Sequence, residues 1–139
     1  MEDMEILGVV ETSLYVNDLK ESIGFYEDLF GFERLVSDDR FCAFAVANRQ
    51  VLLLFRKGAS TEPMPFPGGI IPPHDGQGTL HLAFGIPTKA FDGWKARLAA
   101  RNFAIESTVS WPLGGRSLYF RDPDGHLVEL MTPGVWRVY

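Results

Sequence analysis

The chain is poor in cysteine and has no long apolar run, and both shortages limit what the protein can be. Cys42 is the only cysteine among 139 residues, so no internal disulfide can form and a reducing cytoplasm is the simplest compartment. No apolar run approaches the ~20 residues of a membrane-spanning helix. The acidic start, MEDME, lacks the apolar segment of a secretory signal. We therefore expect a cytoplasmic protein that does not enter a membrane.

Positive charge is also in short supply. The chain has 13 Lys and Arg against 18 Asp and Glu, a net charge of −5. This balance argues against nonspecific binding to nucleic acid or to an anionic membrane, because both need clustered positive charge. A small anionic substrate is still compatible, since a local site can be positive. The apolar content of 46% and the charged content of 22% are typical of a globular protein.

The first half of the chain has the pattern of a strand, a helix and three more strands. Apolar and β-branched residues predict a strand over 6–16. Asp18 and Glu21 have the spacing of a helix N-terminal capping box, and Gly31 is typical of a helix end. Three further strands are expected at residues 32–37, 40–47 and 51–55.

Residues 58–78 differ from the rest of the chain. They are rich in proline and glycine and show no periodicity. This composition predicts a long loop without strands. Loops of that length in compact domains are usually functional lids or linkers.

The second half repeats the first pattern. A strand is expected at 80–87, followed by a helix with Thr88 as its N-cap and a strand at 103–109. The sequence Asp122-Pro-Asp-Gly125 then predicts a tight turn between two strands within 116–131. The aromatic tail at 132–139 is expected to dock on the domain.

The two halves align as an internal repeat of the plan βαβββ. Glu11 and His81 each lie seven residues before a residue predicted to cap a helix. Aligning Arg40 with Arg116 puts Leu53 at the position of Glu129. Three of these four equivalent positions, Glu11, His81 and Glu129, hold metal-binding side chain types inside apolar strands.

Side-chain alternation supports a common site. If Val10, Thr12, Leu14 and Val16 pack under the first helix, then Glu11, Ser13 and Tyr15 face the opposite side. By the same rule His81 faces away from the second helix. A carboxylate such as Glu129 is expensive to bury in a strand without a partner. Each of these residues is therefore either solvent-exposed on its strand or a ligand of a shared metal ion.

These motifs together resemble the vicinal oxygen chelate superfamily, which includes glyoxalase I, fosfomycin-resistance proteins, extradiol dioxygenases and bleomycin-resistance proteins. The resemblance is carried by residues 15–19, 25–32, 81–84 and 119–130. It implies an α+β fold in which two βαβββ modules, about 6–57 and 79–132, form one cupped eight-stranded mixed sheet. Residues 1–139 would be one domain, with 58–78 as the joining loop. The fold itself hosts many reactions.

The resemblance implies one divalent metal ion held by Glu11, His81 and Glu129. Leu53 stands where glyoxalase I has a fourth ligand, and Glu11 stands where the family more often has His or Gln. One His with two carboxylates is not the 2-His-1-carboxylate set of Fe(II) oxygenases. This donor set favours Mn(II) or Mg(II), with Zn(II), Ni(II) and Fe(II) still open.

The resemblance also implies roles for residues around the metal. Ser117 and Tyr119 match residues that contact the phosphonate in fosfomycin-modifying relatives, and Ser13 matches a Thr with the same role. Tyr119 would donate a hydrogen bond or proton, and His74 would reach the site from the loop. Glu11 or Glu129 would act as the base.

Three functions stay open from the sequence. The first is a metal-dependent lyase, isomerase or transferase that acts on a small oxygen-bearing molecule by Lewis-acid chelation. An extradiol-type dioxygenase is the second, and a non-catalytic protein that binds a small molecule, like the bleomycin-resistance proteins, is the third. By resemblance, we expect a homodimer.

Several other residues are expected to have structural roles. Cys42 should be buried and inert, and His126 should be a surface or turn residue. Arg40 and Arg116 occupy equivalent positions, which favours a structural role over catalysis. Four aromatic residues can form apolar walls for a substrate or pack in the core: Tyr15, Phe55, Trp111 and Trp136.

Overall fold

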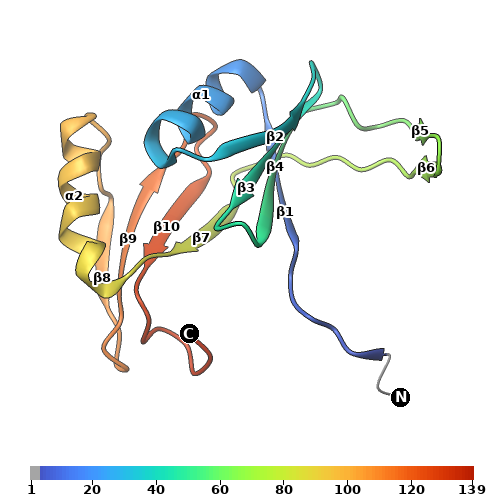
Figure 1. Cartoon of the computed structure of the whole chain (residues 1–139). Helices are drawn as coiled ribbons and strands as arrows, with labels where there is room; N and C mark the ends of the chain where they lie inside the picture. The colour runs from blue at the N-terminus through green and yellow to red at the C-terminus, as the bar shows by residue number, and fades with distance from the viewer. Residues whose placement is uncertain (1–3) are drawn as a thin grey trace. The chain divides into compact units, whose positions relative to one another are not determined.

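The computed structural model describes residues 4–139. Within it the chain forms two compact units, of which the first ends at Gly78 and the second begins at Thr79 (Figure 1). No helix among the described residues is both long enough and apolar enough to cross a bilayer.

The first unit is built on a four-stranded sheet with the strand order β1-β4-β3-β2. β1 runs parallel to β4, and the other neighbours are antiparallel. The elements of this unit are β1 (Glu11–Val16), α1 (Leu19–Phe30), β2 (Glu33–Ser37), β3 (Phe41–Val46), β4 (Gln50–Arg56), β5 (Met64–Phe66) and β6 (Gly69–Ile71).

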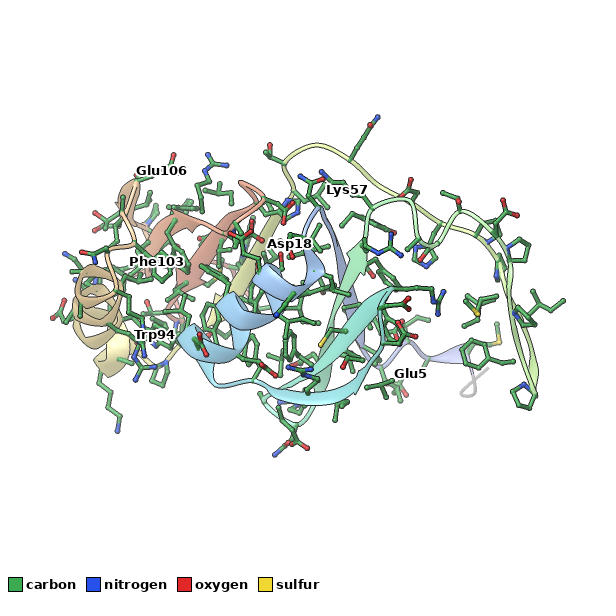
Figure 2. All side chains as sticks on the ribbon, turned by 90° about the horizontal axis from the view of Figure 1, so that it is seen from above. Glu5, Asp18, Lys57, Trp94, Phe103 and Glu106 are labelled. Atoms are coloured by element: carbon green, nitrogen blue, oxygen red, sulfur yellow. The ribbon has the colours of Figure 1, made fainter. Side chains whose placement is uncertain are left out.

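Local signals define both ends of α1, as predicted. The Asp18 carboxylate accepts a hydrogen bond from the Glu21 backbone N–H at 3.1 Å, which satisfies one of the free donors of the first turn. Figure 2 labels Asp18 at this end of the helix. Gly31 ends the helix with a φ of 70°, a conformation that glycine adopts without strain. Tyr26 and Leu29 are fully buried on the side that packs against the sheet.

The first strand is shorter than predicted. It begins at Glu11, and Val9 and Val10 are 76% and 62% exposed. The reason is that β4, its only partner in the sheet, begins at Gln50, and the parallel register starts at Glu11 opposite Val51. Leu14 and Val16 are buried as expected, but Val10 and Thr12 are exposed, so their predicted packing under α1 is wrong.

Residues 58–78 contain a small hairpin, so the prediction of a loop without strands is wrong in part. Met64 pairs with Ile71 and Phe66 pairs with Gly69 in antiparallel register. The two strands flank a Pro-Gly turn and are too short to produce a recognisable alternation in the sequence. Figure 1 shows that the β5–β6 hairpin extends away from the four-stranded sheet of its own unit.

The second unit has the same plan as the first. Its sheet has the order β7-β10-β9-β8, with β7 parallel to β10. Its elements are β7 (His81–Gly85), the short 3-10 helix η2 (Thr88–Ala90), α2 (Phe91–Ala100), β8 (Ser107–Ser110), β9 (Arg116–Arg121) and β10 (Leu127–Met131). The predicted α+β fold with two βαβββ modules is therefore confirmed, and each module carries its own four-stranded sheet.

The start of α2 differs from the prediction that Thr88 caps it. The backbone N–H of Ala90 donates to Pro87 O, and that of Phe91 donates to Thr88 O. These carbonyls occupy the donors that a Thr88 side chain would cap, so a 3-10 turn precedes the helix. Ala90 then takes the N-cap position without a side-chain bond. Figure 2 labels Trp94 on α2, where the Arg97 guanidinium lies 4.8 Å from its ring centre.

Strand register supports the predicted repeat alignment. Glu11 pairs with Val51 in the first unit, and His81 pairs with Leu127 in the second. Counting two residues onward places Leu53 and Glu129 at the same position in their modules. The first sheet therefore carries Leu53 at the position where the second sheet carries Glu129.

Candidate functional site

Three neighbouring strands of the second unit bring His81, Glu129 and Tyr119 together. Glu129 pairs directly with Tyr119 across β10 and β9. His81 pairs with Leu127, two residues before Glu129, so it lies on the same face of the sheet. The His81 Nε2 atom is 3.2 Å from Glu129 Oε1. On the other side, the Tyr119 hydroxyl donates to Glu129 Oε2 at 3.0 Å.

The Glu129 carboxylate is buried, whereas His81 is open to solvent. Only 5% of the Glu129 side chain is exposed, compared with 50% for His81. A buried carboxylate is costly unless it is paired. Among the described residues, Oε2 accepts a hydrogen bond from the Tyr119 hydroxyl and Oε1 contacts the His81 imidazole.

The other nitrogen of His81 fixes the state of the imidazole. Nδ1 lies 2.9 Å from the Leu127 carbonyl oxygen, which can only accept, so Nδ1 carries the proton. In the neutral ring, Nε2 then presents a lone pair toward Glu129 Oε1. Two facing acceptors need a proton or a cation between them. Two ligands of one divalent ion lie about 3 Å apart when their bonds are near right angles, so the pair fits a metal centre.

Tyr119 is held by a chain of polar side chains. The Trp111 Nε1 atom donates to Ser117 Oγ at 2.8 Å, and Ser117 is fully buried. Ser117 in turn is hydrogen-bonded to Tyr119. Burial, followed by the Glu129 carboxylate, raises the pKa of Tyr119. The phenol therefore keeps its proton at neutral pH and is available as a donor.

Sequence analysis missed two contributors to this cluster. They are the Leu127 carbonyl, which sets the His81 tautomer, and the Trp111 indole, which holds Ser117. A backbone acceptor carries no residue-type signal. Trp111 was expected to form an apolar wall or to pack in the core, and neither expectation includes a hydrogen bond from its indole.

His126 was predicted to be a surface or turn residue, and the structure places it at the end of the β9–β10 turn with its side chain buried. Its Nδ1 atom accepts from the Leu80 backbone N–H at 2.9 Å, and this bond ties the β9–β10 turn to the start of β7. Asp122, Asp124 and His126 have ligand-type atoms within 4.8 Å of one another. However, Asp122 Oδ1 already accepts the backbone N–H groups of Asp124 and His126. This group therefore closes the turn.

The first unit holds the other predicted site residues around one cavity of about 390 Å³. Glu11, Ser13 and Tyr15 line it from alternate positions of β1, as the predicted alternation requires. Leu53 and Phe55 line it from β4.

His74 is a fixed part of the cavity wall. Its Nδ1 atom is hydrogen-bonded to the Tyr15 hydroxyl at 2.8 Å, and its ring lies edge-on to Phe55 with centres 4.5 Å apart. The His74 backbone N–H donates to Ser60 O at 2.8 Å. A side chain at Gly76 would collide with the Tyr15 ring. Burial, followed by Asp75, raises the pKa of Tyr15.

The remaining residues have structural contacts. Cys42 is buried as predicted, and burial raises the pKa of its thiol to about 11. The Arg116 guanidinium lies 4.0 Å from the Phe91 ring centre. Arg40 lies 3.6 Å from the Asp38 carboxylate and also lines the cavity.

The predicted metal ligands are divided between the units. His81 and Glu129 are adjacent in the second unit, together with Tyr119 and Ser117. Glu11 belongs to the first unit, with Ser13 and His74. A site that combines all three ligands stays a prediction.

Comparison with known proteins identifies the family. The sequence profile of the Glyoxalase/Bleomycin resistance protein/Dioxygenase superfamily matches residues 8–130. The metallothiol transferase FosB of Bacillus licheniformis is 30% identical over 137 residues, covering 98% of this chain and 82% of the relative. The fosfomycin resistance protein FosX of Listeria innocua is 29% identical over 133 residues, covering 90% and 89%.

A solved structure gives the same answer. The crystal structure of a lactoylglutathione lyase from Agrobacterium tumefaciens has a TM-score of 0.86 and 34% identity, covering 95% of this chain and 98% of that one. The predicted resemblance is thus confirmed, and these relatives include enzymes named as transferases and as a lyase. The chain belongs to the Glyoxalase/Bleomycin resistance protein/Dioxygenase superfamily.

Proposed function

We propose that this protein is a divalent-metal-dependent enzyme that acts on a small oxygen-bearing molecule, as a lyase, isomerase or transferase. The observation that carries the proposal is the contact between His81 Nε2 and Glu129 Oε1 at 3.2 Å. In the tautomer with its proton on Nδ1, which donates a hydrogen bond to Leu127 O, both Nε2 and Oε1 are acceptors. A divalent cation bound between these two atoms would satisfy both of them.

Glu11, His81 and Glu129 would hold the ion. Glu11 and His81 occupy equivalent places in their modules, opposite Val51 and Leu127, and residues 1–139 would act as one domain. When bound, the ion supplies Lewis acidity toward two adjacent substrate oxygens. Mn(II) or Mg(II) suits one nitrogen and two carboxylate donors best.

The side chains around the ligands would handle binding and proton transfer. Tyr119 keeps its phenolic proton and would donate it, or a hydrogen bond, to a substrate oxygen. Ser117 and Ser13 would orient the substrate. His74, which lies in the segment 58–78, would form a wall beside it. Glu11 is the better candidate for the base, because Glu129 is held by two neighbours.

A non-catalytic binding protein is the second candidate. The cavity of the first unit has largely apolar walls, which suits sequestration as well as catalysis. An extradiol-type dioxygenase ranks lower, because one His with two carboxylates is not the usual Fe(II) oxygenase set.

Metal content tests the proposal. We expect about one equivalent of divalent metal per chain in protein purified without chelator, and almost none in His81→Ala. Asp124→Asn is the matched control, because it alters the acidic turn and leaves the proposed ligands intact. If the parent protein binds no metal after addition of Mn(II), Ni(II) or Zn(II), the proposal of a metal-dependent enzyme is wrong. The non-catalytic binding protein is then the favoured function.

We also propose that the protein is a cytoplasmic homodimer. Residues 4–10 precede β1 and form a segment that we call the arm. Its apolar side chains are open to solvent, with Ile6 86% and Leu7 90% exposed. A second copy of the chain is the partner we propose for them. The single buried cysteine suits a reducing compartment.

A further inference from the structure

The cavity of the first unit is larger than a small polar substrate needs. Its volume is about 390 Å³, whereas an apolar cavity of about 150 Å³ already holds benzene. The walls of this cavity therefore indicate a different kind of substrate.

Aromatic rings form one side of the cavity. Tyr15 and Phe55 are stacked with ring centres 5.9 Å apart and planes 25° apart. Phe55 and Phe41 are stacked in the same way, at 5.8 Å and 20°. All three residues line the cavity. A flat ring gains more from such a surface than a methyl group does, because it adds stacking to the burial of area.

The β5–β6 hairpin supplies further apolar lining. Met64, Phe66 and Ile71 line the cavity, yet Phe66 and Ile71 are 52% and 48% exposed. Large apolar side chains held at a cavity mouth are typical of a ligand site. Ile70, the neighbour of Ile71, is 68% exposed and is not part of the lining.

The cavity also has a polar end. Glu11, Ser13 and Tyr15 follow one another along β1. Alternate residues of a strand are about 7 Å apart, so polar side chains continue from the Glu11 carboxylate through Ser13 to the aromatic end at Tyr15. A molecule with oxygens at one end and a ring at the other matches this order.

We propose that the substrate carries an aromatic ring next to its oxygen-bearing group, and that the ring binds in the first-unit cavity beneath Ile71. This inference rests on the proposed function, since the oxygens are those that would meet the metal ligands. The preferred substrate is therefore an aromatic oxygen compound, such as an aryl-substituted hydroxy acid, and not a small aliphatic phosphonate.

Two probes that differ only in the ring test the substrate class. Mandelate and lactate share the same hydroxy acid group, but mandelate has phenyl where lactate has methyl. On Mn(II)-loaded protein, calorimetry should give a dissociation constant more than tenfold lower for mandelate, which is about 1.4 kcal/mol. Equal affinities would overturn the proposal.

Neighbouring residues of the hairpin test the location. Both Ile71→Ser and Ile70→Ser remove an exposed apolar side chain from a short hairpin, so neither should unfold the domain. Ile71→Ser should reduce the preference for mandelate at least threefold, and Ile70→Ser should leave it unchanged. If the two variants behave alike, the ring does not bind in this cavity.

A measurement on metal-free protein tests the ring site independently of the proposed metal-dependent function. Benzyl alcohol, with ethanol as its ring-free counterpart, should shift the NMR amide signals of Met64 and Ile71 in protein without metal. If Mn(II) fails to bind but benzyl alcohol still shifts these signals, the metal-dependent function falls and the ring site stands. If benzyl alcohol shifts no signal from the cavity lining, the ring site is wrong.

Discussion

Glu129 needs its hydrogen-bond partners, because its carboxylate is buried on an inner strand of the second unit's sheet. Tyr119→Phe removes the donor to Oε2 and leaves that buried oxygen without this hydrogen bond. We expect the free energy of unfolding of the metal-free protein to fall by about 1–3 kcal/mol, as measured by urea denaturation.

Tyr139→Phe is the control for the loss of a phenol. The Tyr139 hydroxyl is 3.5 Å from Met131 O and the residue is 41% exposed, so this change should cost less than about 0.5 kcal/mol. If both variants lose the same stability, the Tyr119–Glu129 bond does not support the folded state.

Cys42 makes the stability of the fold sensitive to alkali. Burial raises the pKa of its thiol to about 11, compared with about 8.5 in an unfolded chain. Between these values the unfolded chain loses the thiol proton and the folded chain keeps it, so the free energy of unfolding falls as pH rises.

The comparison with Cys42→Ala isolates this effect. The free energy of unfolding of the parent should fall by about 2–3 kcal/mol relative to that of Cys42→Ala between about pH 8.5 and pH 11. Denaturant titration at each pH measures this difference. Below that window the difference should be constant. A difference that is independent of pH up to pH 11 would contradict the burial of the thiol.

At the scale of elements, α1 depends on its N-cap. Asp18→Ala removes the acceptor of the Glu21 N–H and should lower the free energy of unfolding by about 1 kcal/mol. Asp28→Ala is the matched control on the exposed face of the last turn. A negative charge there opposes the helix dipole, so its removal should be neutral or slightly stabilising. If Asp18→Ala and Asp28→Ala change the thermal unfolding temperature by the same amount, the Asp18 cap does not stabilise α1.

Elements with local signals could be predicted from the sequence, and elements defined by distant partners could not. Asp18 and Gly31 mark both ends of α1 within the helix itself. The start of β1 depends on where β4 begins, at Gln50, which no local pattern near Ile6 contains. Thr88 has the right type for a cap, but backbone carbonyls occupy the donors first.

The candidate site follows the same rule. The repeat matches His81 to Glu11 and Glu129 to Leu53, and the His81 and Glu129 side chains are in contact. Their electrostatic state depends on the Leu127 carbonyl and on burial, which sequence does not reveal. The role of Glu11 as a third ligand stays a prediction.

At the scale of the whole molecule, the arm is expected to control assembly. Figure 1 shows the N-terminal segment leading away from β1, and Ile6 and Leu7 are almost fully exposed on it. The double change Ile6→Ser and Leu7→Ser should shift the protein from dimer to monomer, because it removes apolar area that a second copy would bury. Sedimentation equilibrium should show at least a tenfold weaker association.

Leu113→Ser is the control for this test. Leu113 is 64% exposed on the second unit, so its removal changes surface apolarity without changing the arm. If association weakens equally in the arm variant and in Leu113→Ser, the arm is not the dimer contact. The same conclusion holds if the parent protein is already a monomer.

The equivalence of Leu53 and Glu129 has a consequence for how such a protein changes over generations. The same sheet position carries hydrocarbon in one module and charge in the other. Substitutions around Leu53 can therefore reshape what the cavity accepts while the Glu129–His81 pair in the other module is untouched. A duplicated fold of this kind can acquire new substrates by drift in one copy and keep its chemistry in the other.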